Sequence, residues 1–491
     1  MIVRFARCFG VCMGLLAGAA TLAQNENDVF RHSYLQPGGT ARSAALAGAF
    51  GALGADMGCV SLNPAGFGLF LTTEISITAG MEVNDAASMY YGQSASSTRS
   101  RFHVGNFGMV LHQPIDKGNN WRSSTFGIVY DRQATFHWDR QAAARDVPST
   151  ILTSFVNEAN GTPADRLFTD FPFTSGLAWE TYAMDILDTA ANSYRAGIPA
   201  GGPTAQTHLV SSEGRSNTTA LFYSANYADR LYIGAQMGIL GTRFIRSTEH
   251  REEALDPSFD TQELVYHEDL DSRGTGIDLR IGLIGRLSDA FRAGVSYRSP
   301  MWFGMTDTYT ARMSTQLRTG QGYAYESPLG TFEYNLNTPS SWLFSAAYIA
   351  GQHGAVSIDY EYMDYGTGRL KSNSSSLVPY SFEAENAAVR AVGAKSNSVR
   401  VGTEWVFGNW LARGGWGYWT NPFVETDSRH GQALKRYTAG IGYRTLHVSI
   451  DLCLNYDVRG NNYYPYDPST VQPVNETLTS YRGLLTLAWR P

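Results

Sequence analysis

Few residues of this chain have the types and spacing that catalysis or metal binding requires. The run 269–274 begins like a calcium-binding loop, but Arg273 stands where an oxygen ligand is needed and Arg280 where such loops carry a bidentate Glu. The ten histidines lack the spacing of a metal site, and no nucleophile-elbow, zinc-protease or phosphate-loop motif occurs. We therefore predict no metal, no cofactor and no enzymatic activity; a Ser–His pair assembled from distant strands is the alternative that spacing leaves open.

The N-terminus has the pattern of a secretory signal peptide. Arg4 and Arg7 form a charged region, residues 9–20 are apolar, and small residues precede a cleavage point after Ala23. We predict that residues 1–23 are removed and the rest is exported; a buried N-terminal helix is the alternative.

The composition restricts the class of protein. Charged residues make up 17%, below the roughly 25% of soluble domains, while aromatics reach 13% and there are 50 glycines. After the N-terminus we find no apolar run of the about 18 residues that a membrane-spanning helix needs. A net charge of −6 gives no reason to expect nucleic acid as a partner. A membrane β-barrel fits this balance, because only every second residue of its strands faces lipid.

Apolar and polar residues alternate with a period of two along most of the chain. In the run 448–457 every second residue from Val448 to Tyr456 is apolar, and the alternate positions include Asp451, Asn455 and Asp457. The pattern recurs in 277–283, 291–298, 399–407 and 437–444. Such alternation indicates strands with one apolar and one polar face.

Connection lengths separate a membrane barrel from a soluble sandwich. The predicted strands are 72–82, 101–112, 122–136, 216–228, 230–247, 262–286, 290–312, 330–349, 352–370, 395–407, 410–419, 434–444, 446–458 and 477–489. Very short turns alternate with long polar links in this series, as periplasmic turns alternate with external loops in outer-membrane barrels. We therefore predict an all-β fold: a transmembrane antiparallel β-barrel of about fourteen strands, spanning residues 72–491.

Two segments depart from the alternation. The external connection 137–215 contains helix-like stretches near 151–156 and 181–188. Its aromatic residues either form an apolar surface that captures ligand or pack among the loops; they are Phe155, Phe168, Phe171, Phe173, Trp179 and Tyr182. The segment 24–71 is rich in Gly and Ala, which suits tight packing in a lumen, so we predict a plug; a free periplasmic domain is the alternative.

The end of this segment has the residues of a fixed bend. Pro64 restricts its own backbone and keeps Asn63 out of helix, so that the Asn63 side chain can bond nearby backbone. We expect Asn63, Pro64, Ala65 and Gly66 to hold the plug in one pose until ligand displaces it; a turn that merely starts the barrel is the alternative.

The two remaining cysteines offer one further possibility. Cys59 lies in the predicted plug, and the alternation places Cys453 on the luminal face with Asp451 and Asn455. A disulfide between plug and wall is possible in an oxidising compartment, but we favour two separate small apolar residues.

An ordered set of motifs resembles the FadL/TodX family of outer-membrane transporters of long-chain fatty acids and aromatic hydrocarbons. The motifs are Gly39-Thr40-Ala41-Arg42, Gly48-Ala49-Phe50, Ser61-Leu62-Asn63-Pro64-Ala65-Gly66, Leu287-Ser288-Asp289, Gly294-Val295-Ser296-Tyr297-Arg298-Ser299-Pro300, Thr338-Pro339-Ser340, Ile358-Asp359-Tyr360-Glu361-Tyr362-Met363-Asp364-Tyr365, Arg400-Val401-Gly402-Thr403-Glu404 and Tyr437-Thr438-Ala439-Gly440-Ile441-Gly442-Tyr443. The connection 137–215 does not align with that family's ligand loops, and Trp489 is third from the end, whereas barrel assembly signals usually end on an aromatic residue.

The resemblance implies a location in the outer membrane and passive transport of hydrophobic small molecules. External loops would capture the ligand, and movement of the N-terminal hatch would release it, toward the periplasm or sideways into the membrane. Long-chain fatty acids are the expected ligands, with aromatic hydrocarbons or heme as alternatives. The other expected partners are outer-membrane lipid and the barrel assembly machinery. A general porin and an adhesin or structural barrel are the competing functions.

Overall fold

The computed structural model describes residues 26–35, 38–115, 120–373 and 380–491. The predicted signal peptide, 1–23, lies outside these residues. No helix in the described part of the chain is long and apolar enough to cross a membrane.

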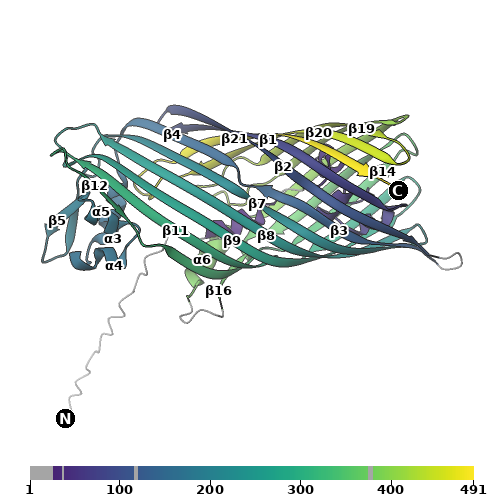
Figure 1. Cartoon of the computed structure of the whole chain (residues 1–491), viewed down its shortest axis with the longest axis horizontal. Helices are drawn as coiled ribbons and strands as arrows, with labels where there is room; N and C mark the ends of the chain where they lie inside the picture. Colours follow the sequence, from purple (N-terminus) through teal and green to yellow (C-terminus); the bar gives the residue numbers. More distant parts are fainter. Residues whose placement is uncertain (1–25, 36–37, 116–119, 374–379) are drawn as a thin grey trace, which may run out of the picture.

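Fourteen antiparallel strands, counted over the described residues, close into one barrel (Figure 1). In chain order the wall consists of β1 (Glu74–Tyr90), β2 (Gln93–Pro114), β3 (Trp121–Thr135) continued by β4 (Trp138–Val147), β7 (Thr204–Tyr227), β8 (Leu231–Ala254), β9 (Thr261–Arg286), β10 (Phe291–Arg298) continued by β11 (Trp302–Leu317), β13 (Gly330–Asn337) continued by β14 (Ser341–Ile349), β15 (Gly354–Asp364) continued by β16 (Arg369–Ser372), β17 (Lys395–Phe407), β18 (Trp410–Trp419), β19 (Leu434–Arg444), β20 (Val448–Tyr463) and β21 (Val474–Trp489). β1 pairs with both β2 and β21, which closes the barrel. The predicted fold class is confirmed.

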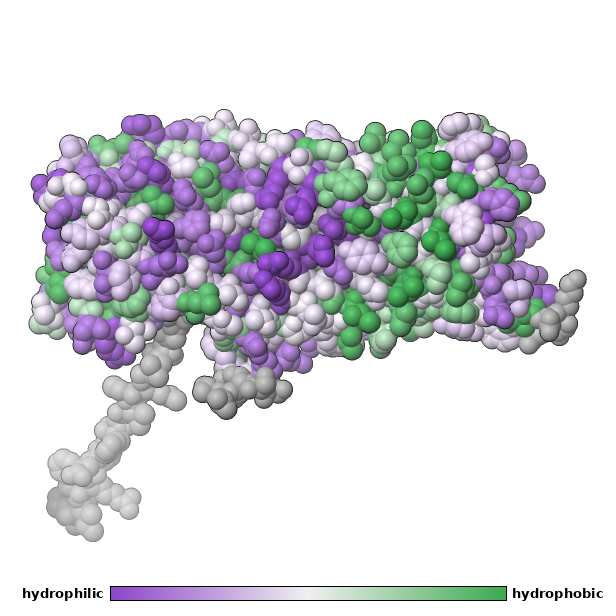
Figure 2. Space-filling model, in the orientation of Figure 1, coloured by the Kyte–Doolittle hydropathy of each residue, from purple (hydrophilic) through white to green (hydrophobic). Residues whose placement is uncertain are grey.

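The alternation has the predicted orientation. On β20, Leu452 and Leu454 are exposed on the outside, whereas Asp451 and Asn455 are buried inside. Figure 2 shows the hydrophobic residues gathered in a band over one half of the barrel, with a hydrophilic surface over the other half. Lipid around this band accounts for exposed apolar side chains that water would penalise. The barrel therefore spans the outer membrane with the banded half, and the half bearing the long loops projects beyond it.

The wall extends farther from the membrane than the alternation predicts. β1 and β2 continue to Tyr90 and Gln93, and β4 and the first half of β7 extend the strands on either side of the long connection. Outside the membrane both faces of a strand can be polar, so the apolar–polar pattern stops before the strand does. The connection predicted as 137–215 is therefore only 148–203.

This connection, with its small helices, forms a cap on the external end of the barrel. It contains α3 (Ile151–Ala159), η3 (Ala164–Arg166), α4 (Leu167–Asp170), α5 (Ser175–Glu180), β5 (Met184–Asp188) and β6 (Ser193–Ala196). The helix expected near 151–156 is present. The prediction of a helix at 181–188 is wrong, because Met184–Asp188 is a strand paired with Ser193–Ala196. The pairing in this hairpin provides the backbone hydrogen bonds that a helix would have provided within itself. Three further elements lie in other loops: β12 (Gly322–Glu326), η4 (Tyr365–Thr367) and α6 (Glu383–Val392).

The N-terminal segment lies inside the barrel (Figure 1). It contains α1 (Glu26–Ser33), α2 (Ala41–Ala45), η1 (Met57–Ser61) and η2 (Pro64–Leu69). α2 packs on β18 to β21, η1 on β2 and β3, and η2 on β7 to β9, so the segment touches opposite sides of the wall.

Candidate functional site

Luminal carboxylates hold the N-terminal segment through its backbone. Asp359 on β15 accepts the Phe50 and Gly51 N–H groups at 3.1 and 3.0 Å, and Asp131 on β3 accepts the Gly39 N–H at 2.8 Å. Such hydrogen bonds to a charged acceptor are about twice as strong as neutral ones. Small side chains in the segment allow its backbone to come this close to the wall.

A buried ion network ties the same segment to the strands near the C-terminus. The Arg42 guanidinium binds both carboxylate oxygens of Glu404 at 2.9 Å. Arg413 donates to Glu404 and to Asp451, each at 2.6 Å. Two cations therefore face two anions, and the buried charges are balanced. An uncompensated charge at this depth would be strongly destabilising.

The predicted hatch residues lie together where the segment meets the wall. The Asn63 Oδ1 atom accepts the Ala65 N–H at 3.1 Å, and its Nδ2 donates to the Gly51 and Leu283 carbonyls at 2.9 and 3.2 Å. Pro64 begins η2, and Ala65 and Gly66 follow it, all buried. Asn63 thus connects the bend to the plug at Gly51 and to β9 at Leu283. Its side chain bonds nearby backbone, as the sequence predicted.

Glycines in the wall make room for this junction. A β-carbon at Gly282 would lie 1.9 Å from the Asn63 Oδ1 atom, and one at Gly234 would lie 2.3 Å from the Pro64 carbonyl carbon. Real β-carbons do not approach other atoms so closely, so any larger residue here would force the junction to move.

The two cysteines are free thiols in separate places. Cys59 packs in an apolar cluster with Phe67 and Phe70, whereas Cys453 lies against Ala44 and Ala45 of α2. The favoured interpretation of two separate small apolar residues agrees with this arrangement.

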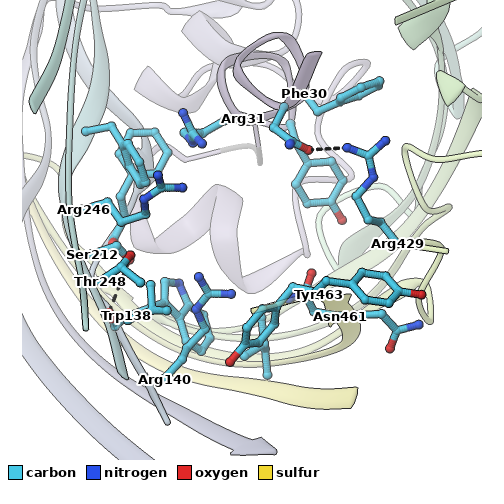
Figure 3. Close-up of a pocket in the computed structure, with 18 of the residues that line it drawn as sticks. Phe30, Arg31, Trp138, Arg140, Ser212, Arg246, Thr248, Arg429, Asn461 and Tyr463 are labelled. Carbon is cyan, nitrogen blue, oxygen red and sulfur yellow. Dashed lines mark hydrogen bonds between the residues drawn. The ribbon is translucent and has the colours of Figure 1, made fainter. Parts of the chain in front are cut away.

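A cavity of about 1030 Å³ lies in the external half of the lumen, between α1 and the cap. Its lining includes Phe30 and Arg31 from α1, Ile151 and Phe155 from α3, and Tyr266 from β9. Figure 3 shows Trp138, Arg140, Arg246 and Tyr463 around the same space. The volume is at the upper end of the range for small-molecule sites, about 300–1,000 Å³.

Several arginines line the cavity, together with carboxylates that pair with some of them. Arg140 is 3.4 Å from the Glu476 carboxylate, Arg429 pairs with Asp427, and Arg31 pairs with Asp28. Arg246 differs from them: within the described residues it has no ion-pair partner, and its buried Nε has no hydrogen-bond acceptor. A guanidinium in this condition is ready to bind a carboxylate with two parallel hydrogen bonds.

Aromatic rings give the cavity an apolar side. Arg31 lies 4.0 Å above the Phe244 ring, and Phe155 packs edge-on against Tyr266. His32 on α1 adds no charge nearby, because burial lowers the pKa of its imidazole to about 3, and the adjacent Arg31 contributes to the decrease. The cavity therefore suits a molecule with an apolar body and an acidic group.

The aromatic residues predicted to form an apolar ligand surface mostly pack against the apolar core of the cap. Phe155 is buried and also reaches the cavity. Phe168, Phe171, Phe173 and Trp179 pack against the cap's apolar cluster. Tyr182 is exposed and packs on the Tyr323 ring. Five of the six therefore share one apolar cluster in the cap, and Tyr182 lies on its exposed side.

Sequence reasoning did not identify the cavity's main residues. Trp138 and Arg140 fell within the expected loop, and Arg246 was one of many arginines in the predicted strands. The alternation could have shown only that Arg246 faces the lumen, because it shares the inward face of β8 with Thr248. Periodicity gives that face but not which strands meet around a cavity.

The barrel wall is interrupted beside the N-terminal segment. The β2–β3 ladder ends at the pair Asn106–Asp131. Beyond this point side chains connect β2 to β4, the continuation of β3: the Arg99 guanidinium binds the Asp139 carboxylate at 2.8 Å. A register shift between Arg132 and Ala134 lies at the same level. This is a weak line in an otherwise continuous ladder.

The described residues thus form a closed membrane barrel whose lumen holds the N-terminal segment and an amphiphilic cavity. No protein-family model matches the chain, and no curated protein matches it. Solved structures do match, over nearly the whole length. The toluene transporter TodX of Pseudomonas putida has 12% identity and a TM-score of 0.54, covering 93% of this chain and 99% of its own. A FadL homologue of Pseudomonas aeruginosa has 12% identity and a TM-score of 0.53, covering 93% and 98%.

A third match has the same extent. The toluene transporter TbuX of Ralstonia pickettii has 14% identity and a TM-score of 0.51, covering 92% of this chain and 98% of its own. At these identities the likeness shows the fold alone. The chain has the FadL-type fold, and the resemblance expected from the motifs is confirmed at that level.

Proposed function

We propose that this protein carries hydrophobic small molecules passively across the outer membrane, and that long-chain fatty acids are among its ligands. The observation that supports this most is the luminal cavity, which combines aromatic walls with the unpaired guanidinium of Arg246. An acyl chain gains about 0.8 kcal/mol per buried CH2 group, and the carboxylate would bind Arg246. The names of the matching toluene transporters make aromatic hydrocarbons the alternative ligands.

The occupied lumen argues against a general porin. Residues 38–70 are largely buried inside the barrel and contact the wall on several sides. Passage then requires the N-terminal segment to move.

The interruption between β2 and β3 offers a sideways exit, because few backbone hydrogen bonds need to break there. The first experiment is mass spectrometry of an organic extract of the purified protein: a fatty acid supports the proposal, and a polar solute contradicts it.

Substitution of Arg246 tests the acidic group of the ligand. We expect Arg246→Gln to weaken palmitate binding about tenfold, since a hydrogen bond to a charged group contributes about 1.5–3 kcal/mol. Binding of hexadecanol, which has the same chain without a carboxylate, should not change. Isothermal titration in detergent measures both ligands.

Arg318→Gln is the matched control, because Arg318 is exposed on an external loop and carries the same charge. The control should bind both ligands as the unsubstituted protein does. Equal loss of palmitate and hexadecanol in Arg246→Gln would mean that the cavity was distorted, and unchanged palmitate binding would contradict the assigned role of Arg246.

Substitution of the junction tests gating by the N-terminal segment. Asn63→Ala with Pro64→Ala removes the side chain that joins the bend, Gly51 and β9. We expect reduced uptake of radiolabelled fatty acid by cells with the amount of folded barrel in the membrane unchanged. Unchanged uptake would mean that Asn63 and Pro64 only begin the barrel. The heat-dependent shift in gel mobility of barrel proteins measures the folded amount.

A further inference from the structure

Three arginines form a row on the outside of the barrel. The pairing register places Arg215 of β7 directly opposite Arg243 of β8, and Arg243 directly opposite Arg273 of β9. Residues paired in this way have their β-carbons about 4.5–5.5 Å apart and share one face of the sheet. All three side chains are exposed, on the outer face.

The row lies just beyond the membrane band. Ile239 on β8 and Ile277 on β9 are exposed and paired with each other, and each is four residues from the arginine of its strand. Four residues of a strand tilted about 40° rise roughly 10 Å. Headgroups extend about 5–8 Å beyond the hydrocarbon on each side, and an arginine side chain can reach toward them. Figure 2 shows strongly hydrophilic residues beside the hydrophobic band, where Figure 1 places β7, β8 and β9.

The row has more positive charge than its neighbours neutralise. Asp271 accepts hydrogen bonds from Arg243 at 2.7 Å and from Arg273 at 2.6 Å. Arg215 has no ion-pair partner among the residues that the structure describes. Glu213, two residues from Arg215 on β7, pairs with Arg99 at 3.1 Å. Like charges directly opposite each other in a sheet are destabilising, so three arginines that share the Asp271 carboxylate favour an added anion.

We propose that this row binds the phosphate of a phosphorylated lipid in the outer leaflet. Arginine suits phosphate because its planar guanidinium donates two parallel hydrogen bonds. The lipid chains would lie against the apolar band below, on Ile239, Ile277 and Leu279. Both parts of such a lipid are therefore matched by adjacent parts of the wall. This lipid site is independent of the luminal cavity and of transport.

The test compares two variants with equal loss of charge. The first is Arg215→Gln with Arg243→Gln and Arg273→Gln. The control is Arg251→Gln with Arg312→Gln and Arg318→Gln, which changes one partly exposed arginine of β8, one exposed arginine of β11 and one exposed arginine just after β11, all nearer the external end. Native mass spectrometry of the full chain in detergent, titrated with lipid A, measures binding of a phosphorylated lipid. Dephosphorylated lipid A and inorganic phosphate are the comparison probes.

We expect the row variant to lose about tenfold or more in affinity for lipid A, from the loss of charge-assisted hydrogen bonds. The control variant should retain its affinity, and dephosphorylated lipid A should bind weakly to all three proteins. Equal loss in both variants would point to net charge alone and overturn the proposal, as would no loss in either. Displacement of lipid A by millimolar inorganic phosphate would assign the row to free phosphate instead. Heat-dependent gel mobility confirms that each variant is folded.

Discussion

Deletion of residues 24–60 is expected to convert the closed barrel into an open pore. The deleted residues include α1, α2 and most of η1, which lie in the lumen against β18 to β21 and against β2 and β3. A barrel of this strand number approaches the size at which barrels enclose an aqueous channel, so we expect at least about a tenfold rise in single-channel conductance. Planar-bilayer recordings of the purified deletion protein and of the full chain measure the difference.

The wall should survive this deletion because its luminal charges keep partners. Glu404 loses Arg42 but retains Arg413 at 2.6 Å, and Asp359 retains Arg400 at 3.8 Å. Asn106 still donates to Asp131 at 2.9 Å. Heat-dependent gel mobility should therefore be preserved. A folded deletion protein with unchanged conductance would show that the segment does not block the lumen.

Filling the wall glycines at the junction is expected to dislodge the N-terminal segment without removing it. In Gly234→Val with Gly282→Val, the new side chains would overlap Pro64 and Asn63. Overpacking typically costs about 1–3 kcal/mol, and the junction can relieve it only by moving inward, since the wall is fixed by its ladders. Cys59, which is 2% exposed, reports the movement. We expect its labelling by a water-soluble maleimide to accelerate roughly tenfold or more, because 1.4 kcal/mol changes an opening equilibrium tenfold.

The matched control is Gly285→Val on the same strand. A β-carbon at Gly285 meets only the Leu287 side chain, at 4.0 Å. In this control, Cys59 should be labelled at the same rate as in the unsubstituted protein. Peptide mass mapping distinguishes labelling of Cys59 from labelling of Cys453. If Cys59 labelling accelerated equally in the control, the cause would be a loosened wall. If labelling stayed slow in both variants, the junction would tolerate larger residues.

The sequence determined the strands where they cross the membrane, and which face of each is outside. Lipid on one side and a polar lumen on the other impose a period of two, so Leu452 and Asp451 could be assigned to opposite faces from their spacing. Short turns and long loops then indicated the strand number and the ends of the barrel. The small residues of 24–71 predicted tight packing, and Asn63 and Pro64 predicted a fixed bend.

The tertiary structure decided everything that depends on which strands are neighbours and how they are paired. Water touches both sides of the wall beyond the membrane, so no alternation marked β4 or the start of β7, and the cap was overestimated in length. Arg246, Trp138 and Tyr463 come from three distant strands and meet only because the barrel closes. Arg215, Arg243 and Arg273 are regularly placed on their strands but become a row only through register. A single strand specifies its own faces, whereas register and closure arise from all strands pairing together.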